Sequence, residues 1–136
     1  MITYRTGNDL SLDAVIDLYR ASTLGERRPI EDRERVAAML RHANLIVTAW
    51  DGELLVGISR ALTDRVYVTY LSDLAVRSSH QRAGIGKELL RRTQVAAPDA
   101  QIVLLAAPAA EKYYPRVGLT HHSQAWVLKP NENISP

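Results

Sequence analysis

The sequence predicts an α/β (α+β) protein, with a mixed central sheet that carries helices on both faces. Three observations support this fold class. Residues 66–76 form a long run rich in β-branched and aromatic residues, residues 85–96 place apolar side chains at helical spacing, and residues 102–107 are the uninterrupted apolar run typical of a covered parallel strand. At 136 residues, the chain fits a single domain, residues 1–136, with one core.

The first half of the chain predicts a strand, two helices and a run of antiparallel strands. In two stretches the apolar side chains recur at i, i+3, i+4 and i+7, which indicates amphipathic helices. Ser11 is a suitable N-cap for the first helix, and Asp51-Gly52 is a dipeptide favoured in two-residue hairpin turns. The expected elements are a strand at 2–5, a helix at 12–19, a loop at 22–29, a helix through 36–43, and strands at 45–50 and 53–62.

The second half predicts a long strand and a helix, then a parallel strand and a final helix and strand. This gives the element order β-α-α-β-β-β-α-β-α-β. The tail from about residue 130 is expected to be flexible. The expected elements are a strand at 66–76, a helix at 85–96, a strand at 102–107, a short helix after Pro108, and a strand at 119–128.

The composition limits the possible functions. The chain contains no cysteine, which excludes a cysteine nucleophile and a disulfide framework. The formal charge of +2 is too small to indicate a nucleic-acid partner, and no apolar run reaches membrane-spanning length. The adjacent His121 and His122 would point to opposite faces of a strand, so we expect no metal site. The N-terminus resembles a strand rather than a signal peptide, and we expect a cytoplasmic protein.

Residues 80–87, His-Gln-Arg-Ala-Gly-Ile-Gly-Lys, form the most informative segment. They lead into the start of the predicted helix, where unpaired amide groups and the helix dipole favour an anion. Gly84 and Gly86 lack side chains that would keep a ligand away from the backbone, and Arg82 and Lys87 add positive charge. The segment therefore predicts a polyphosphate site. A glycine-containing capping loop is the plainer alternative.

Two common phosphate-binding motifs do not fit this segment. A Walker A loop needs a glycine and a Ser or Thr where this chain has Gln81 and Glu88. A Rossmann fingerprint needs a glycine directly at the strand end and another where Leu89 stands. Here seven residues separate Val76 from Gly84, and no acidic residue closes the next predicted strand.

A third motif does fit. The run Gln81-Arg82-Ala83-Gly84-Ile85-Gly86 follows Val76 after a gap of four residues and resembles the acyl-CoA-binding signature of the GNAT superfamily of N-acetyltransferases. The predicted element order matches this family over about residues 2–128. The resemblance implies a GNAT fold with six to seven strands. Because residues 118–129 offer only one clear strand, a seventh strand would be short, missing or supplied by a partner chain.

The resemblance also implies a cofactor, acetyl-CoA, and the residues that hold it. Backbone amides at the end of the fourth strand, by position those of Leu74 and Val76, would hold pantetheine and polarise the acyl carbonyl. The loop and the helix start would hold the pyrophosphate. The full implied set is Leu74, Ala75, Val76, Gln81, Arg82, Ala83, Gly84, Ile85, Gly86 and Lys87.

A second motif lies further along the chain. Residues 110–119, AEKYYPRVGL, resemble the GNAT segment in which a tyrosine lies near the cofactor sulfur. Tyr114 takes that position, which implies a general acid for the departing thiolate, although a packed aromatic with a satisfied hydroxyl is the alternative. Tyr113 and Leu119 replace the usual phenylalanines. Pro115 should shorten the helix that contains Tyr114.

Acyl transfer to an amine also needs a base or a water chain, because a primary amine is mostly protonated at pH 7. Asp73 is the best candidate in sequence, since it is a carboxylate in an apolar strand near the implied acyl site. Strict alternation would place it on the same face as Leu71 and opposite Ser72. The alternative is that Asp73 holds a backbone amide or an arginine in place. Glu26 is the second candidate, in a loop that commonly borders the acceptor site in this superfamily.

Together these observations predict an acetyl-CoA-dependent N-acetyltransferase. It would transfer the acetyl group directly to a primary amine of a small molecule or peptide within a ternary complex. We expect no nucleic-acid or membrane partner. The resemblance, together with the single clear strand predicted at the C-terminus, favours a homodimer. A non-catalytic acyl-CoA-binding or sensing module is the alternative from another functional class.

Overall fold

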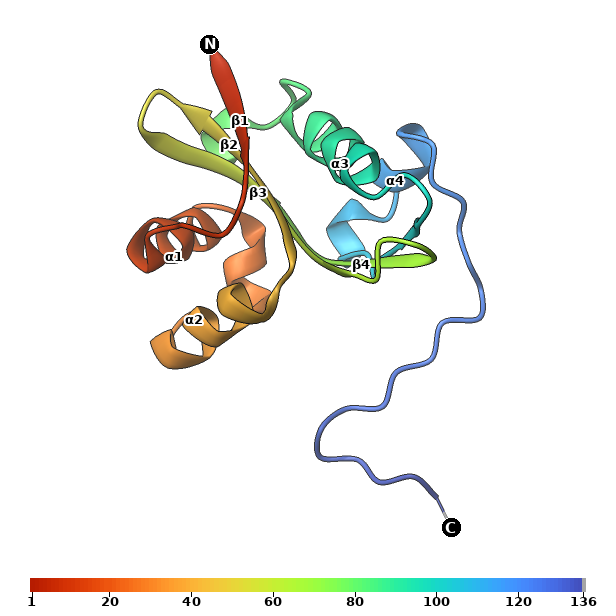
Figure 1. Ribbon diagram of the computed structural model, residues 1–136. Coiled ribbons are helices and arrows are strands. Elements are labelled where there is room, and N and C mark those ends of the chain that lie inside the picture. The colour runs from red at the N-terminus through yellow and green to blue at the C-terminus, as the bar shows by residue number, and fades with distance from the viewer. Residues whose placement is uncertain (136) are drawn as a thin grey trace. The chain divides into compact units, whose positions relative to one another are not determined.

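The computed structural model describes residues 1–135 and contains a five-stranded mixed sheet in the order β1-β2-β3-β4-β5 (Figure 1). The first four strands are antiparallel neighbours, and β5 pairs in parallel with β4. The strands are β1 (Ile2–Thr6), β2 (Leu45–Asp51), β3 (Leu54–Thr63), β4 (Val68–Val76) and β5 (Gln101–Val103). The helices are α1 (Leu12–Arg20), α2 (Arg33–His42), α3 (Ile85–Ala96) and α4 (Tyr113–Arg116), with short 3-10 helices η1 (Thr23–Arg27), η2 (Ser78–His80) and η3 (Pro108–Ala110).

The chain divides into two compact units. Met1–Leu105 contains the whole sheet with α1, α2 and α3, and the residues from Ala106 onward contain η3 and α4. Within residues 1–135, no helix combines the length and the apolar composition needed to cross a bilayer.

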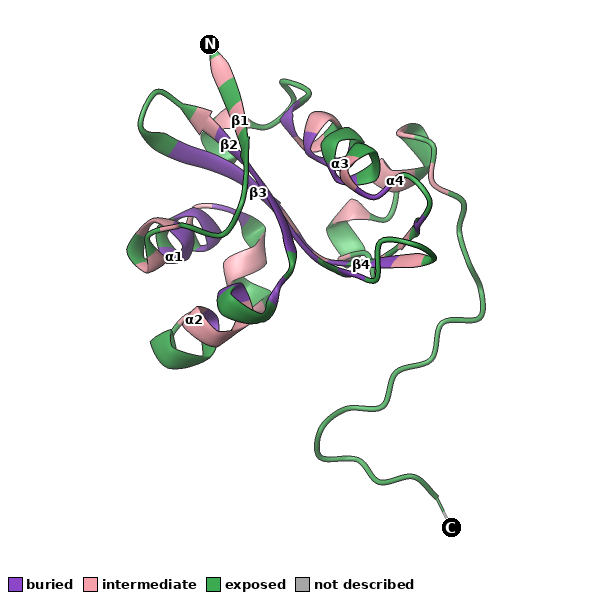
Figure 2. Ribbon diagram, viewed as in Figure 1, coloured by how far each residue is buried: buried purple, intermediate pink, exposed green. Residues whose placement is uncertain are grey.

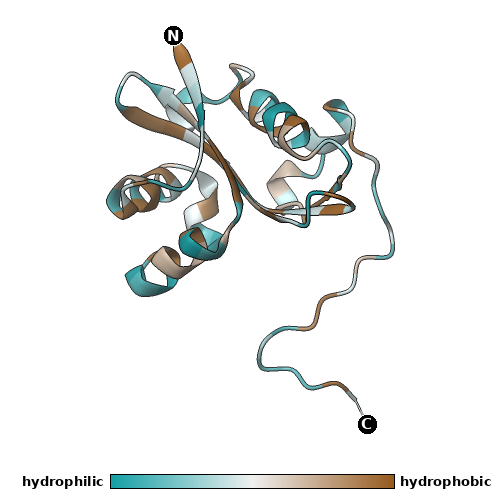
Figure 3. Cartoon of the chain, viewed as in Figure 1, coloured by the Kyte–Doolittle hydropathy of each residue, from teal (hydrophilic) through white to brown (hydrophobic). Residues whose placement is uncertain are grey.

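The sheet separates two apolar layers within the first unit. One layer joins α1 and α2 to inward side chains such as Ile46, Ile58 and Ala75. The other joins Ile85 and Leu89 of α3 to Val47, Ala49 and Val56. Successive residues of β2 therefore serve opposite faces, as the pleat of a strand requires. The buried strands lie between these helices in Figure 2, and Figure 3 shows the same strands as largely apolar.

Local signals position most of these elements as predicted. The Ser11 hydroxyl accepts a hydrogen bond from the Ala14 amide at 3.3 Å and begins α1, and the Asp32 carboxylate caps α2 in the same way. The β2–β3 turn is displaced by one residue from its expected place. Asp51 pairs with Leu54, so the turn is formed by Gly52 and Glu53, and Gly52 supplies the positive φ of 60°.

The C-terminal strands differ from the prediction. The predicted strand 102–107 is shorter, since β5 ends where Val103 pairs with Tyr70. The predicted strand 119–128 is absent, and the apolar side chains of Trp126, Val127 and Leu128 are exposed, that of Trp126 at 93%. A strand exists only through a neighbour's hydrogen bonds, and residues 119–128 have no such neighbour in the described chain. The sheet therefore has five strands, and the expected six or seven are not formed.

Candidate active site

The loop before α3 has the geometry of an anion cradle. Arg82 and Gly84 both adopt left-handed backbone conformations, with φ of 64° and 81°. Gly84 is the N-cap residue of α3, and no side chain caps this helix start within the described residues. The first amide groups of α3 are therefore not occupied by a capping oxygen. Residues 81–84 are exposed, so this backbone faces solvent.

The loop of residues 81–84 is attached to the end of β4. The Gln81 side-chain amide donates to the Val76 carbonyl at 3.1 Å, which folds the loop back onto the end of β4. Ile85 is buried on the sheet, whereas Lys87 is exposed. Glu88 turns away from the helix start and accepts hydrogen bonds from Arg91 and Arg92, so it does not place a negative charge over the cradle.

The predicted pantetheine-binding stretch lies where β4 loses its neighbour. Pairing between β4 and β5 covers only Val68 to Tyr70, and further along β4 no partner on that side is found among the described residues. On the other side, Leu74, Ala75 and Val76 remain paired with β3. One edge of this strand end therefore has no strand partner among the described residues, while the opposite edge is paired with β3.

Asp73 lies beside a β-bulge that the sequence pattern did not reveal. Asp73 is opposite Arg60, but Leu71 is opposite Ala61, so Ser72 is an extra residue in β4. Ser72 and Asp73 consequently point to the same side, and both bind the Arg60 guanidinium. The alternation that separated Asp73 from Ser72 and grouped it with Leu71 is therefore wrong.

The Asp73 carboxylate is fully buried and fully engaged. Its Oδ2 atom accepts from Arg60 Nε at 2.5 Å and from the Tyr19 hydroxyl at 2.7 Å, and its Oδ1 atom accepts from Arg28 Nε at 2.6 Å. Burial by itself would raise the pKa of Asp73, but the hydrogen bonds and charges of Arg60, Tyr19 and Arg28 outweigh it and lower that pKa. Burial and the neighbouring carboxylate raise the pKa of Tyr19. The geometry is that of a structural anion.

Glu26 lies on η1, in the connection between α1 and α2. Its side chain is exposed, and η1 is capped by Ser22, whose hydroxyl accepts from the Leu24 amide at 3.3 Å. Glu26 is two residues from Arg28, which binds Asp73. The first unit therefore brings the Glu26 segment to the end of β4.

Tyr114 belongs to the second unit. It forms an edge-to-face pair with Tyr113, with ring centroids 5.3 Å apart. Burial, and secondarily Tyr113, raises the pKa of Tyr114, so its hydroxyl keeps its proton at neutral pH. The helix α4 is short, Tyr113–Arg116, but it includes both Tyr114 and Pro115, so Pro115 lies within the first helical turn, where proline is tolerated.

Three partners of Asp73 were not identified from the sequence: Tyr19, Arg28 and Arg60. A signal for Arg60 was present, because it is the one charged residue of β3, as Asp73 is of β4. Two opposite charges in adjacent buried strands indicate a pair. Arg28 had no such signal, since it lies in a polar loop.

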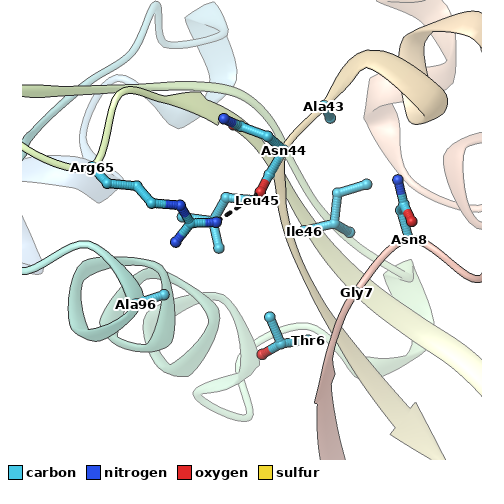
Figure 4. A pocket seen from close by; sticks show the side chains of 9 residues that line it. All are labelled: Thr6, Gly7, Asn8, Ala43, Asn44, Leu45, Ile46, Arg65 and Ala96. Carbon is cyan, nitrogen blue, oxygen red and sulfur yellow. Dashed lines mark hydrogen bonds between the residues drawn. The ribbon is translucent and has the colours of Figure 1, made fainter.

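A cavity of ≈ 210 Å³ lies elsewhere in the first unit, near Ala96 at the far end of α3 (Figure 4). Arg65 reaches into it and donates to the Asn44 carbonyl at 3.1 Å. Twelve helical residues, a length of roughly 18 Å, separate this end of α3 from the Gly84 cradle. None of the predicted site residues lines this cavity.

An acetyltransferase (GNAT) domain family model matches residues 21–127 of this chain. The chain therefore belongs to the GNAT acetyltransferase family, and the fold agrees with that membership.

Individual relatives are consistent with this family. The uncharacterized N-acetyltransferase ycf52-like of Prochlorococcus marinus is 31% identical over 114 residues, covering 79% of this chain and 58% of that protein. The chain thus spans less than two thirds of this relative. The GNAT family protein SP0256 from Streptococcus pneumoniae TIGR4 has 26% identity and a TM-score of 0.76, covering 95% of this chain and 99% of its own. The aminoglycoside N-acetyltransferase AAC(6')-Iy, solved in complex with CoA, has 15% identity and a TM-score of 0.74. The match covers 96% of this chain and 95% of that protein's chain.

Proposed function

We propose that this protein transfers the acetyl group of acetyl-CoA to a primary amine by direct attack within a ternary complex. The observation that supports this most strongly is the uncapped start of α3 behind the left-handed residues Arg82 and Gly84. Amide groups at a helix N-terminus suit the pyrophosphate of CoA. AAC(6')-Iy, which shares the fold, is a CoA complex.

The proposed cofactor contacts follow the order of the chain. Leu74, Ala75 and Val76 provide backbone groups for pantetheine at the open edge of β4. The loop and the first turn of α3 take the pyrophosphate. The residues assigned to this second task are Gln81, Arg82, Ala83, Gly84, Ile85, Gly86 and Lys87.

In the proposed reaction, the neutral amine nitrogen attacks the thioester carbonyl and forms a C–N bond. The resulting oxyanion is stabilised by backbone amides, and the C–S bond then breaks. The thiolate takes a proton from the Tyr114 hydroxyl, which its raised pKa keeps protonated. The proton lost by the amine leaves through Glu26 or water.

We do not assign the base role to Asp73, although it was the first candidate from the sequence. A base needs a free lone pair directed at its substrate, whereas both Asp73 oxygens accept from Arg60, Arg28 and Tyr19. Its lowered pKa also makes it a weak base. We propose that Asp73 has a structural role at the bulge.

The proposal extends to the acceptor, the assembly and the location. The acceptor is taken to be a small-molecule or peptide amine, and the protein is taken to act in the cytoplasm. We propose a homodimer because the apolar residues Trp126, Val127 and Leu128 are exposed in a single copy. Light scattering at micromolar concentration tests the dimer directly.

Release of free CoA thiol from acetyl-CoA tests the activity, with lysine, spermidine, kanamycin and a short peptide as acceptors. Tyr114→Phe should slow transfer by about 10²- to 10⁴-fold if its hydroxyl is the general acid. Tyr113→Phe, in the same aromatic pair, is the matched control and should retain activity. Cofactor binding without any turnover would instead indicate the non-catalytic acyl-CoA-binding module.

A further inference from the structure

Arg28 connects the α1–α2 segment to the bulge in β4. Its Nε atom donates to Asp73 Oδ1 at 2.6 Å, and its Nη2 atom donates to the Ser72 carbonyl at 2.7 Å. The side chain is 20% exposed, so one guanidinium spans the boundary between solvent and the buried carboxylate. These bonds join Arg28 to residues that lie 44 and 45 positions further along the sequence.

Arg28 is not needed to neutralise Asp73. Arg60 is 8% exposed and already pairs with Asp73 at 2.5 Å, while Tyr19 donates to the same oxygen. Two guanidinium groups on one carboxylate leave a net charge of +1. Electrostatic compensation therefore accounts for Arg60, and Arg28 requires a different explanation.

The same segment is fixed at its other end. The Ser22 hydroxyl donates to the Tyr19 carbonyl at 3.0 Å. Gly25 lies so close to α1 that an added Cβ would be 2.6 Å from the Tyr19 carbonyl oxygen. Tyr19 thus supports residues 22–25 through its backbone and binds Asp73 through its hydroxyl. Glu26 is exposed between these two attachments.

We propose that Arg28 is a positioning residue, which holds residues 22–28 as a fixed wall of the amine-acceptor site. It acts by fastening Glu26 and its neighbours to the β4 bulge and does not touch the substrate. The inference rests on the proposed acetyltransferase function, because the wall has this role only if an amine binds beside it. Loss of Arg28 should weaken the use of the amine and leave acetyl-CoA binding intact.

The variants Arg28→Gln and Arg28→Lys test this proposal, with Arg41→Gln as control. Arg41 is an exposed arginine in the last turn of α2, outside residues 22–28. For each amine of the panel that turns over, Arg28→Gln should raise the KM of the amine by about tenfold or more, with the KM of acetyl-CoA within about twofold. Arg28→Lys should rescue the amine KM in part, because an ammonium retains the charge without the two directed bonds. Arg41→Gln should leave both KM values unchanged.

Hydrogen exchange of the amides in residues 23–28 supplies a readout that needs no acceptor. Exchange should be at least about tenfold faster in Arg28→Gln than in the parent protein and unchanged in Arg41→Gln. Unchanged exchange in Arg28→Gln would overturn the attachment. Faster exchange with an unaltered amine KM would overturn the acceptor wall. If no amine turns over in the parent protein, the proposed function fails, while the exchange result still decides the attachment.

Discussion

The Nε2 atom of His80 lies 2.9 Å from the Oδ2 atom of Asp51, which joins the segment before α3 to the end of β2 at the β2–β3 turn. The second ring nitrogen of His80 lies 2.7 Å from the Ser79 hydroxyl. Both ring nitrogens of His80 are therefore engaged, and the contact with Asp51 supports the loop that begins at Gln81.

Removal of this support should weaken cofactor use selectively. His80→Gln and Asp51→Asn should each raise the KM of acetyl-CoA by about 3- to 10-fold, because the loop loses an attachment to β2. The amine KM should be unaffected. Glu53→Gln, at an exposed position of the same turn, is the control. Steady-state kinetics with varied acetyl-CoA measures the effect, and an unchanged KM in both variants would contradict it.

The His80–Asp51 contact also predicts an acid dependence of stability. The hydrogen bond from His80 lowers the pKa of Asp51. A carboxyl group with a lowered folded-state pKa stabilises the fold above its unfolded pKa of about 4, and this contribution is lost as the pH falls through the folded-state value. Asp51→Asn should therefore flatten part of the acid limb of thermal stability below about pH 4, as measured by melting from pH 2 to 7. An identical acid limb would exclude this contribution.

Removal of the Asp73 carboxylate should be costly. Asp73→Ala leaves the buried Arg60 without its partner, and an uncompensated buried charge typically costs about 3–5 kcal/mol. The double variant Arg60→Met/Asp73→Ala should recover part of this loss, because neither charge remains. Urea unfolding of both variants measures the coupling. A loss below about 1 kcal/mol in Asp73→Ala would contradict this and show that water can solvate the Arg60 guanidinium.

Two glycines should respond to alanine through different mechanisms. At Gly57 an added Cβ would lie 3.0 Å from Leu89 Cδ1 and 3.2 Å from Ile85 Cγ2, so Gly57→Ala should destabilise by about 1–3 kcal/mol through overpacking under α3. At Gly84 nothing lies within 4 Å, and the cost of about 1–2 kcal/mol comes from the positive φ alone. Leu89→Ala should partly rescue Gly57→Ala, as urea unfolding would reveal, and should not rescue Gly84→Ala.

Acetyl-CoA at about 100 times its Kd should stabilise the protein by roughly 2.7 kcal/mol, a melting shift of about 10 °C for this size. Arg82→Gly should reduce this shift, because it removes a positive charge at the cradle. Arg65→Gly is a matched control, since Arg65 has a φ of 68° close to the 64° of Arg82 but lies outside the cradle. Both glycine variants should have similar stability without cofactor. An equal cofactor shift in both would remove Arg82 from the site.

Much of the fold follows from local signals in the sequence. Ser11, Gly84 and the helical spacing from Ile85 onward each depend on neighbouring residues, and the structure confirms the elements they predicted. The prediction of a strand at 119–128 was wrong. An apolar pattern is compatible with strand pairing, but it does not show that a partner strand is present. Hydrogen-bond partners decide strands, and they are distant in sequence.

The candidate site likewise contains parts that depend on neighbouring residues and parts that depend on residues distant in sequence. The cradle is one continuous segment, so its glycines and arginines could be interpreted directly. Asp73 could not, because its environment depends on Arg60 from β3, on Arg28 from a loop, and on a bulge that changes the direction of one side chain. A regular two-residue period cannot reveal an inserted residue.

The bulge at Ser72 reverses the relation between residue number and sheet face along β4. Leu71, before the bulge, pairs with Ala61, and Asp73, after it, pairs with Arg60. Because Ala61 and Arg60 are neighbours in β3, they point to opposite faces, and so do the odd-numbered Leu71 and Asp73. Deletion of Ser72 would leave Leu71 opposite Ala61 and Asp73 opposite Arg60, so each half of β4 would keep the face that it serves. What the extra residue adds is local: the Ser72 hydroxyl accepts from Arg60 and the Ser72 carbonyl accepts from Arg28, on the same side as the Asp73 carboxylate.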